Sequence, residues 1–163
     1  MKMRPVKRFL LRAMALPSAE RWTAIEALIT LAVARVVLAL LPFTRAMACF
    51  GLRPRFEGAG AQQAACADRM VIADAVQRAV RRASKVAPFR AVCLQQAVAA
   101  SLMLRRRGMA VEVHFGVAKD SIGAVNAHAW SVCMGTVITG GFALDGYARI
   151  AVFAESQAQE RAG

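Results

Sequence analysis

The chain has 163 residues, of which 58% are hydrophobic, and a formal net charge of +12. This length suits one domain of ordinary size with a short appendage, and the apolar content excludes an intrinsically disordered chain. Lys and Arg outnumber Asp and Glu by 22 to 10, which favours anionic partners without selecting nucleic acid, an acidic membrane surface or an acidic peptide.

The cysteines and the N-terminal residues indicate the compartment. The four cysteines contain no CxxC pair, so a structural zinc site is not predicted. The basic residues 1–12 are not followed by a compact apolar run with a small-residue cleavage site, so we predict no secretory signal. Free thiols in a reducing cytoplasm are expected, and neither a cofactor nor a metal is predicted.

Residues 24–41 form an apolar run that is nearly long enough to span a bilayer. Glu26 and Arg35 interrupt this run on opposite faces of a helix, so they could not pair in lipid, where a central Arg costs roughly 3 kcal/mol. We predict a helix largely buried against protein, with a membrane-associated helix as the alternative. Residues 18–50 would form one long helix or two shorter ones, with Pro42 closing the apolar run.

A Gly- and Pro-rich stretch at residues 51–60 predicts a linker. It divides the chain into an N-terminal helical region, 1–60, and a second domain, 61–163. An amphipathic helix is expected over 64–85. Its basic residues predict either a solvated face or a surface that guides an acidic partner; they are Arg78, Arg81, Arg82 and Lys85.

The remaining elements are one helix and several strands. Helical residues 92–107 end at Gly108, a natural C-cap residue. Alternating apolar and polar residues then predict strands at 111–117, 127–134, 137–138 and 148–153, with turns at Gly135-Thr136 and Asp145-Gly146. Helices followed by an antiparallel sheet make the predicted fold class α+β.

Cys93 and His128 are the candidates for nucleophilic catalysis. Cys93 falls in the first turn of the helix that begins after Pro88, where the positive end of the helix dipole favours a thiolate. His128 begins a strand and shares a face with Trp130. A cysteine at a helix start and a histidine on a later strand are arranged as in papain-like folds generally.

Structural alternatives stand beside this interpretation. A lone Cys in an apolar helix is usually a small buried residue, and a lone His on a strand is more often structural than catalytic. His114 is the rival base, and we expect it to have a surface role. Cys133, on the strand face opposite His128, is expected to pack in the core, as are Cys49 and Cys66.

The sequence resembles the leader peptidases of lasso-peptide biosynthesis, the family that includes the microcin J25 processing protein. The matching pieces are Cys93-Leu94-Gln95-Gln96-Ala97, Leu104-Arg105-Arg106-Arg107-Gly108-Met109-Ala110, Phe115-Gly116-Val117-Ala118-Lys119-Asp120 and Ala127-His128-Ala129-Trp130. In the N-terminal part the matching pieces are Ala24-Ile25-Glu26-Ala27-Leu28 and Leu40-Leu41-Pro42-Phe43, with Arg45 after them. The order and spacing of these motifs make them fairly specific together.

The resemblance implies a transglutaminase-like, papain-related fold. It also implies a cysteine peptidase that cuts a ribosomally made precursor between leader and core, after which a cyclase similar to asparagine synthetase closes the macrolactam with ATP. Because the chain is too short to contain the small leader-recognition domain as well, a separate recognition protein is the expected partner, docked on residues 1–60.

The chain departs from the family at the third catalytic residue. The family has an Asp roughly a dozen residues after the His, where this chain has Val137-Ile138-Thr139-Gly140-Gly141. Asp145 is the nearest acidic candidate, and Thr139 or a backbone carbonyl are the alternatives. The Cys93 backbone N–H would hold the oxyanion with a second donor, for which Gln95 and Gln96 are candidates.

Two other functional classes compete with the peptidase. A non-catalytic, basic peptide-binding module of the same fold would explain the net charge and the missing Asp. Nucleic-acid binding is not predicted, because beyond its 8 Phe the chain has only 1 Tyr and 2 Trp for stacking, and it has no helix-turn-helix, zinc-finger or RNA-recognition motif.

Overall fold

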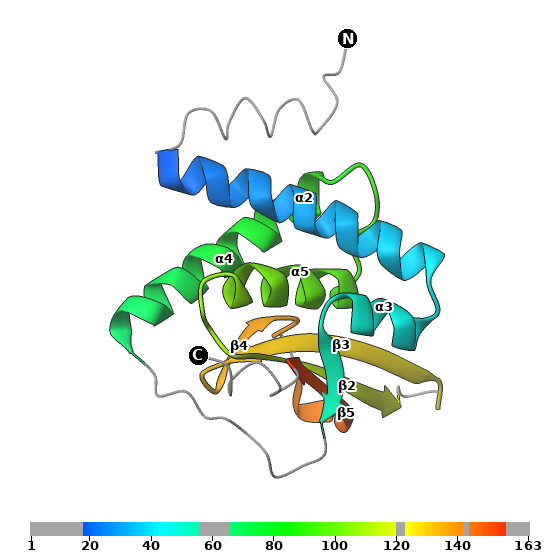
Figure 1. Cartoon of the computed structure of the whole chain (residues 1–163). Helices are drawn as coiled ribbons and strands as arrows, with labels where there is room; N and C mark the ends of the chain where they lie inside the picture. Colours follow the sequence, from blue (N-terminus) through cyan, green and yellow to red (C-terminus); the bar gives the residue numbers. More distant parts are fainter. Residues whose placement is uncertain (1–17, 56–65, 120–122, 142–143, 156–163) are drawn as a thin grey trace.

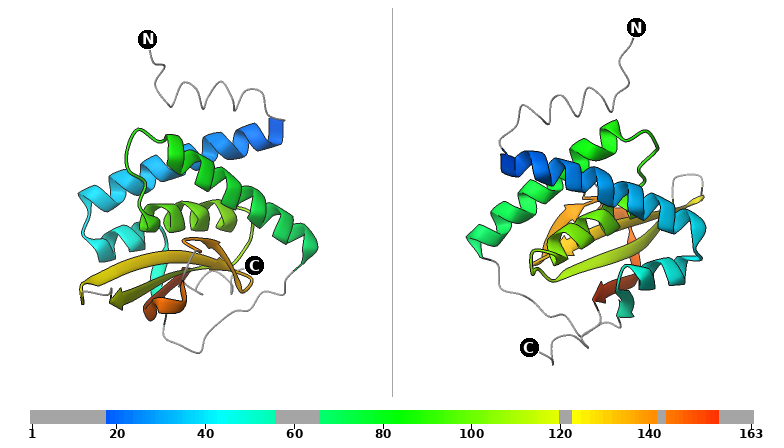
Figure 2. Two further views of the ribbon diagram at one scale, coloured as in Figure 1. Left: turned by 180° about the vertical axis from the view of Figure 1, so that it is seen from behind. Right: turned by 45° about the horizontal axis from the view of Figure 1, so that its top comes forward.

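A computed structural model describes residues 18–55, 66–119, 123–141 and 144–155, which form a helical layer on one face of an antiparallel sheet (Figures 1 and 2). The helices are α2 (Ser18–Leu40), α3 (Phe43–Cys49), α4 (Ala67–Val86) and α5 (Cys93–Arg105). The strands are β1 (Leu52–Arg55), β2 (Val111–Lys119), β3 (Val125–Cys133), β4 (Thr136–Thr139) and β5 (Ala148–Glu155), with a 3-10 turn, η1 (Leu144–Gly146), before β5.

The sheet has the order β1-β5-β2-β3-β4, and each neighbouring pair is antiparallel. Helices that precede an antiparallel sheet confirm the predicted α+β class. The turn between β3 and β4 lies at Met134-Gly135, where both φ angles are positive, one residue before the predicted Gly135-Thr136. Strand β1 falls inside the stretch predicted as a linker, and its pairing of Leu52 with Glu155 places it at the sheet edge, where Pro54 is tolerated.

Helix α5 is the centre of the core and lies between the other helices and the sheet (Figure 1). Its buried residues surround most of its circumference: Gln95, Ala97, Val98, Ala99, Ala100, Ser101, Met103 and Leu104. They pack with Ala27 and Leu31 of α2 in one cluster and with Val113 and Phe153 of the sheet in another. The N-terminal helices and the sheet therefore share this core across the predicted boundary near residue 60.

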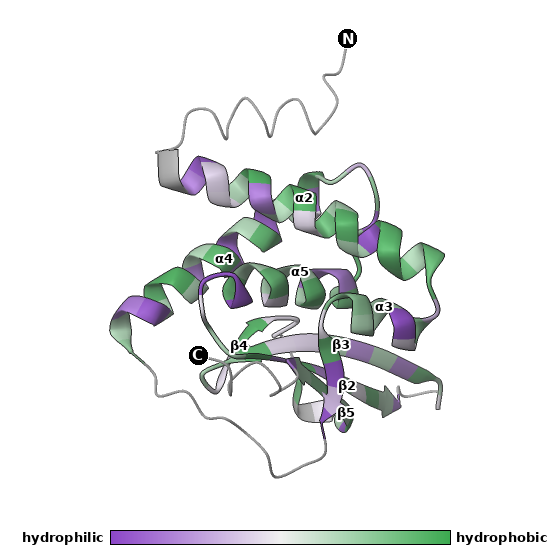
Figure 3. Ribbon diagram, viewed as in Figure 1, coloured by the Kyte–Doolittle hydropathy of each residue, from purple (hydrophilic) through white to green (hydrophobic). Residues whose placement is uncertain are grey.

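Helix α2 is covered on one face only, which corrects the prediction of a largely buried helix. Of the apolar window within Glu20–Leu40, 28% is buried. The buried face is built mainly from alanines, which allow close approach to α4 and α5, and bulky apolar residues remain exposed. Figure 3 shows that hydrophobic residues run along much of α2. By length and composition alone, α2 is the one helix among the described residues that could cross a membrane.

Three consecutive arginines anchor the C-terminal end of α5. Arg105 donates to the Phe50 carbonyl at 2.6 Å and pairs with Glu155 of β5 at 2.6 Å. Arg107 pairs with Glu26 of α2 at 2.6 Å, and Arg106 pairs with the same carboxylate. The arginines therefore connect α5 to α2, to the loop before β1 and to the last strand.

We predict that Glu26→Gln lowers the free energy of unfolding by about 1 kcal/mol at neutral pH, with a smaller loss in acid. Burial raises the pKa of the Glu26 carboxyl, but the hydrogen bonds and charges of Arg107 and Arg106 outweigh this and hold the pKa below its ordinary value of 4.5. A lowered folded-state pKa contributes stability above the unfolded pKa, and this contribution is lost as pH falls through the folded value.

Urea unfolding at pH 7 and at pH 3 measures this difference. Glu20→Gln on the same helix is the matched control, because Glu20 forms only an exposed pair with Arg82 at 3.9 Å and should change stability little. Equal losses for the two variants, or a Glu26→Gln loss that is unchanged in acid, would contradict the prediction.

Candidate active site

Cys93 is the first residue of α5 and is half-buried. Two glutamines of the first turn hold the loop before it. The Val92 backbone N–H donates to the Gln95 side-chain oxygen at 3.2 Å, and the Gln96 amide donates to the Ala91 carbonyl at 2.8 Å. These contacts fix the start of the helix, so the side chains of Gln95 and Gln96 stabilise the loop before Cys93. Their contacts do not identify a second oxyanion donor.

His128 lies on β3 opposite Gly116 of β2. Its ring stacks near the Trp130 ring, with centroids 6.2 Å apart, which confirms that the two side chains share a strand face. The Tyr147 ring is tilted against the His128 ring, with the two centroids 5.2 Å apart. Two aromatic rings therefore restrict how the imidazole can turn.

A backbone carbonyl orients the imidazole. His128 Nε2 lies 2.8 Å from the carbonyl oxygen of Gly140. A carbonyl only accepts hydrogen bonds, so Nε2 must carry the hydrogen, and in the neutral ring Nδ1 is then the unprotonated nitrogen. The contact thus selects the tautomer in which Nδ1 can act as a base.

Gly140 can be replaced by no other residue without strain. Its φ is +76°, and a Cβ there would lie 2.7 Å from the Ala129 carbonyl oxygen and 3.0 Å from His128 Nε2. Gly140 follows His128 by 12 positions, which is close to where the leader peptidases that the sequence resembles have their Asp. The missing Asp at this position indicated in the sequence that another group orients His128, but it did not specify which atom.

The other two candidates for orienting His128 have different positions. The Thr139 hydroxyl pairs with the Ser131 hydroxyl at 2.8 Å in the buried layer of the sheet, so it does not serve His128. The backbone of Asp145 lies in η1, two positions before Tyr147, but its side chain lies outside the described residues. Its catalytic role stays a prediction.

His114 is buried, which makes the expected surface role wrong. Its Nε2 lies 2.8 Å from Glu112 Oε2, and its ring centroid lies 5.6 Å from that of Trp130. Glu112 is in turn 3.5 Å from Arg55. Because the His114 imidazole is buried and its Nε2 is bonded to Glu112, it belongs to this network and is not the base for a reacting thiol.

The other cysteines divide into one buried and two exposed thiols. Cys133 is buried in the core as predicted, and burial raises the pKa of its thiol against a smaller opposing effect of Arg69. Cys49 and Cys66 are exposed, so their predicted packing role is wrong. Cys49 is the last residue of α3, and Cys66 is the N-cap of α4.

Cys93 and His128 come from adjoining layers, and no hydrogen bond joins them among the described residues. Phe115 packs in the cluster that contains α5, and its strand partner Ala129 shares that face. His128, next to Ala129, therefore starts from the opposite face of β3. It does so at the sheet edge, because β4 pairs only with residues 131–133 of β3.

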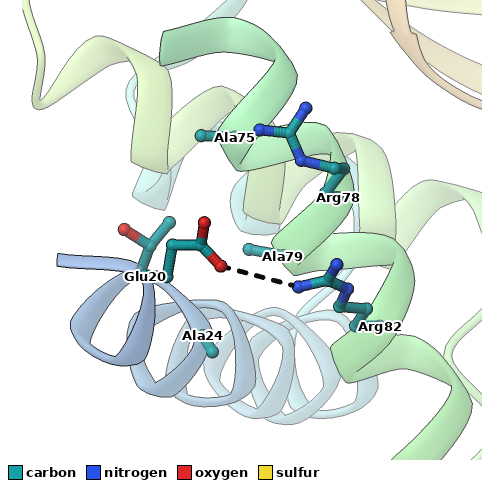
Figure 4. A pocket seen from close by; sticks show the side chains of 7 residues that line it. Glu20, Ala24, Ala75, Arg78, Ala79 and Arg82 are labelled. Atoms are coloured by element: carbon teal, nitrogen blue, oxygen red, sulfur yellow. Dashed lines mark ion pairs between the residues drawn. The ribbon is translucent and has the colours of Figure 1, made fainter. Parts of the chain in front are cut away.

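A hollow on the surface lies away from both side chains, between α2 and α4 (Figure 4). Alanines line it, and Arg78 and Arg82 stand at its rim with Glu20. Since neither a cysteine nor a histidine reaches it, the hollow does not belong to the candidate site. The arginines there are exposed, and their role in guiding an acidic partner stays a prediction.

We predict that Gly140→Ala lowers the free energy of unfolding by about 2–3 kcal/mol, because it adds a steric clash to a positive φ. Gly135→Ala is the matched control: its φ is +74°, but a Cβ there meets nothing within 4 Å, so about 1 kcal/mol is expected. Chemical denaturation of the two variants measures the gap. Equal losses would show that the approach of Gly140 to His128 is not tight.

The sequence matches the family described as the transglutaminase-like superfamily over residues 28–152, whereas no curated protein and no solved structure gives a significant match. Members of this superfamily are usually cysteine-type hydrolases or transferases. The match spans Cys93, His128, Gly140 and most of the helices and strands described above. On this basis the chain belongs to the transglutaminase-like superfamily.

Proposed function

We propose that the chain is a cysteine peptidase that removes the leader from a ribosomally made lasso-peptide precursor. The observation that carries the proposal is the His128 Nε2 contact to the Gly140 carbonyl, which leaves Nδ1 as a base, in a chain whose α5 begins with a cysteine. The motifs shared with lasso-peptide leader peptidases supply the substrate class. They also imply a separate leader-recognition protein and an asparagine-synthetase-like cyclase as partners.

The first turn of α5 lies near the part of the sheet that carries His128. Leu94 packs in the cluster that contains Val113 and Phe115, so the helix starts at the end of the β2–β3 hairpin that also carries His128. Because His128 starts from the sheet face opposite α5, the proposal requires the imidazole and the sulfur to meet around the sheet edge, where β4 pairs only with residues 131–133 of β3. Catalytic hydrogen bonds are often long before substrate binds, and they tighten in the complex.

A neutral orienting group has a chemical consequence. The Gly140 carbonyl fixes the tautomer as a carboxylate would, but it offers only a partial negative charge to the imidazolium that forms during catalysis. The thiolate–imidazolium pair would then depend more on the positive end of α5. We expect slower turnover than in a relative that has an Asp at this position.

The proposed reaction has two steps. His128 Nδ1 takes the proton of the Cys93 thiol, and the sulfur attacks the carbonyl carbon between leader and core while the Cys93 backbone N–H stabilises the oxyanion. His128 then gives the proton to the core amine as the C–N bond breaks. Water hydrolyses the thioester, which releases the leader carboxylate and restores the thiol.

The test is cleavage of the precursor by the full chain together with the recognition protein, followed by mass spectrometry. Cys93→Ala should reduce the rate at least about a thousandfold, because no other group replaces the nucleophile. Cys49→Ala removes an exposed thiol elsewhere and should leave the rate unchanged. Full cleavage by Cys93→Ala would refute the proposal.

The second candidate function is a peptide-binding module without catalysis, favoured by the lack of a hydrogen bond between Cys93 and His128 among the described residues. Iodoacetamide labelling separates the two candidates. The exposed Cys49 and Cys66 serve as internal references, and buried Cys133, with its raised pKa, should react slowest.

For the peptidase we expect Cys93 to react several-fold faster than the exposed references, although it is half-buried. His128→Asn should remove this excess and leave the references unchanged, because it removes only the base. A Cys93 rate at or below that of the references, unaffected by His128→Asn, would favour the binding module.

A further inference from the structure

The outer face of α2 carries a continuous stripe of bulky apolar side chains. Trp22, Ile29, Val33, Val36 and Leu40 are between 45% and 76% exposed. Their spacings of three, four and seven place them on one side of a helix, over roughly 27 Å at about 1.5 Å per residue. Leu41 and Phe43, also exposed, continue the apolar surface into α3.

This stripe lies opposite the face of α2 that packs in the core. Ala24, Ala27, Leu31 and Ala34 are buried against α4 and α5, about half a turn from the stripe. Figure 3 shows α2 at the outside of the helical layer, with hydrophobic residues along much of its length. A contiguous apolar surface of this kind marks a contact with another apolar phase.

Exposed arginines lie in the same helical layer as the stripe, and both acidic residues of α2 are paired with arginines. Arg35 of α2 and Arg45 of α3 are exposed, and the Arg106 side chain, at the flank of α2, is 63% exposed. Glu20 and Glu26 are both paired with arginines. In the sequence, residues 1–17 add further basic residues and no acidic one: Lys2, Arg4, Lys7, Arg8 and Arg12.

We propose that α2 lies flat on an anionic phospholipid bilayer, with the stripe among the acyl chains and exposed arginines of the helical layer at the headgroups. Apolar burial and attraction of basic residues to anionic lipid act together on such interfacial helices. Insertion across the bilayer would remove Ala27 and Leu31 from the core and break the Glu26 ion pair, so the helix lies in the interface. A second copy is disfavoured because two chains of +12 repel each other.

Vesicle flotation with the full chain tests this proposal. The protein should float with vesicles of phosphatidylcholine and phosphatidylglycerol, float less as salt rises, and float weakly with phosphatidylcholine alone. A variant with Ile29→Ser, Val33→Ser and Val36→Ser should lose at least about tenfold in partitioning. All three positions are exposed, so circular dichroism should show an intact fold.

A matched triple variant controls for general loss of hydrophobicity. Val71, Val125 and Ile150 are exposed branched residues of α4, β3 and β5, and their replacement by Ser should leave flotation unchanged. Wild-type protein that does not float, or an α2 variant that floats like wild type, would overturn the proposal. The proposal would also be overturned if light scattering showed that the wild type forms a dimer and does not bind lipid, and that the α2 variant no longer dimerises.

Discussion

The burial of α5 is the constraint on which the rest of the structure depends. A helix of small and medium apolar residues can be enclosed on nearly all sides, and here it is enclosed by α2, α4 and the sheet. Such a helix can meet solvent only at its ends. The arginines fix the C-terminal end to Glu26, Phe50 and Glu155, and the first residue, Cys93, remains at the accessible end.

His128 is controlled from the sheet side by a different device. The Gly140 carbonyl holds Nε2, and the rings of Trp130 and Tyr147 limit the orientation of the imidazole. The acceptor is a main-chain atom, so it needs a glycine that can adopt a φ of +76° close to Ala129. The position of the acceptor is therefore set by the backbone, and the carbonyl itself supplies only a partial negative charge.

The sequence allowed the prediction of most elements but of fewer contacts. Strong periodicity placed α4, α5 and the β2–β3 hairpin within a few residues of their observed ends. Strand β1 was missed because Pro and Gly dominate its neighbourhood, and only pairing with β5, far along the chain, makes it a strand. The burial of His114 and the exposure of Cys49 were also mistaken, because neighbours distant in sequence decide them.

Helix α2 shows why hydrophobicity alone could not locate its buried face. Both faces are apolar, but the smaller residues lie on the buried face and the larger ones on the exposed face, whereas an ordinary amphipathic helix buries its large apolar residues. Alanines dominate the buried face, where α4 and α5 approach closely, and the larger Trp, Ile, Val and Leu side chains point outward. Packing explains the alanines. The folded chain offers no partner among its described residues for the larger side chains, and the proposed lipid interface would account for both their size and their direction.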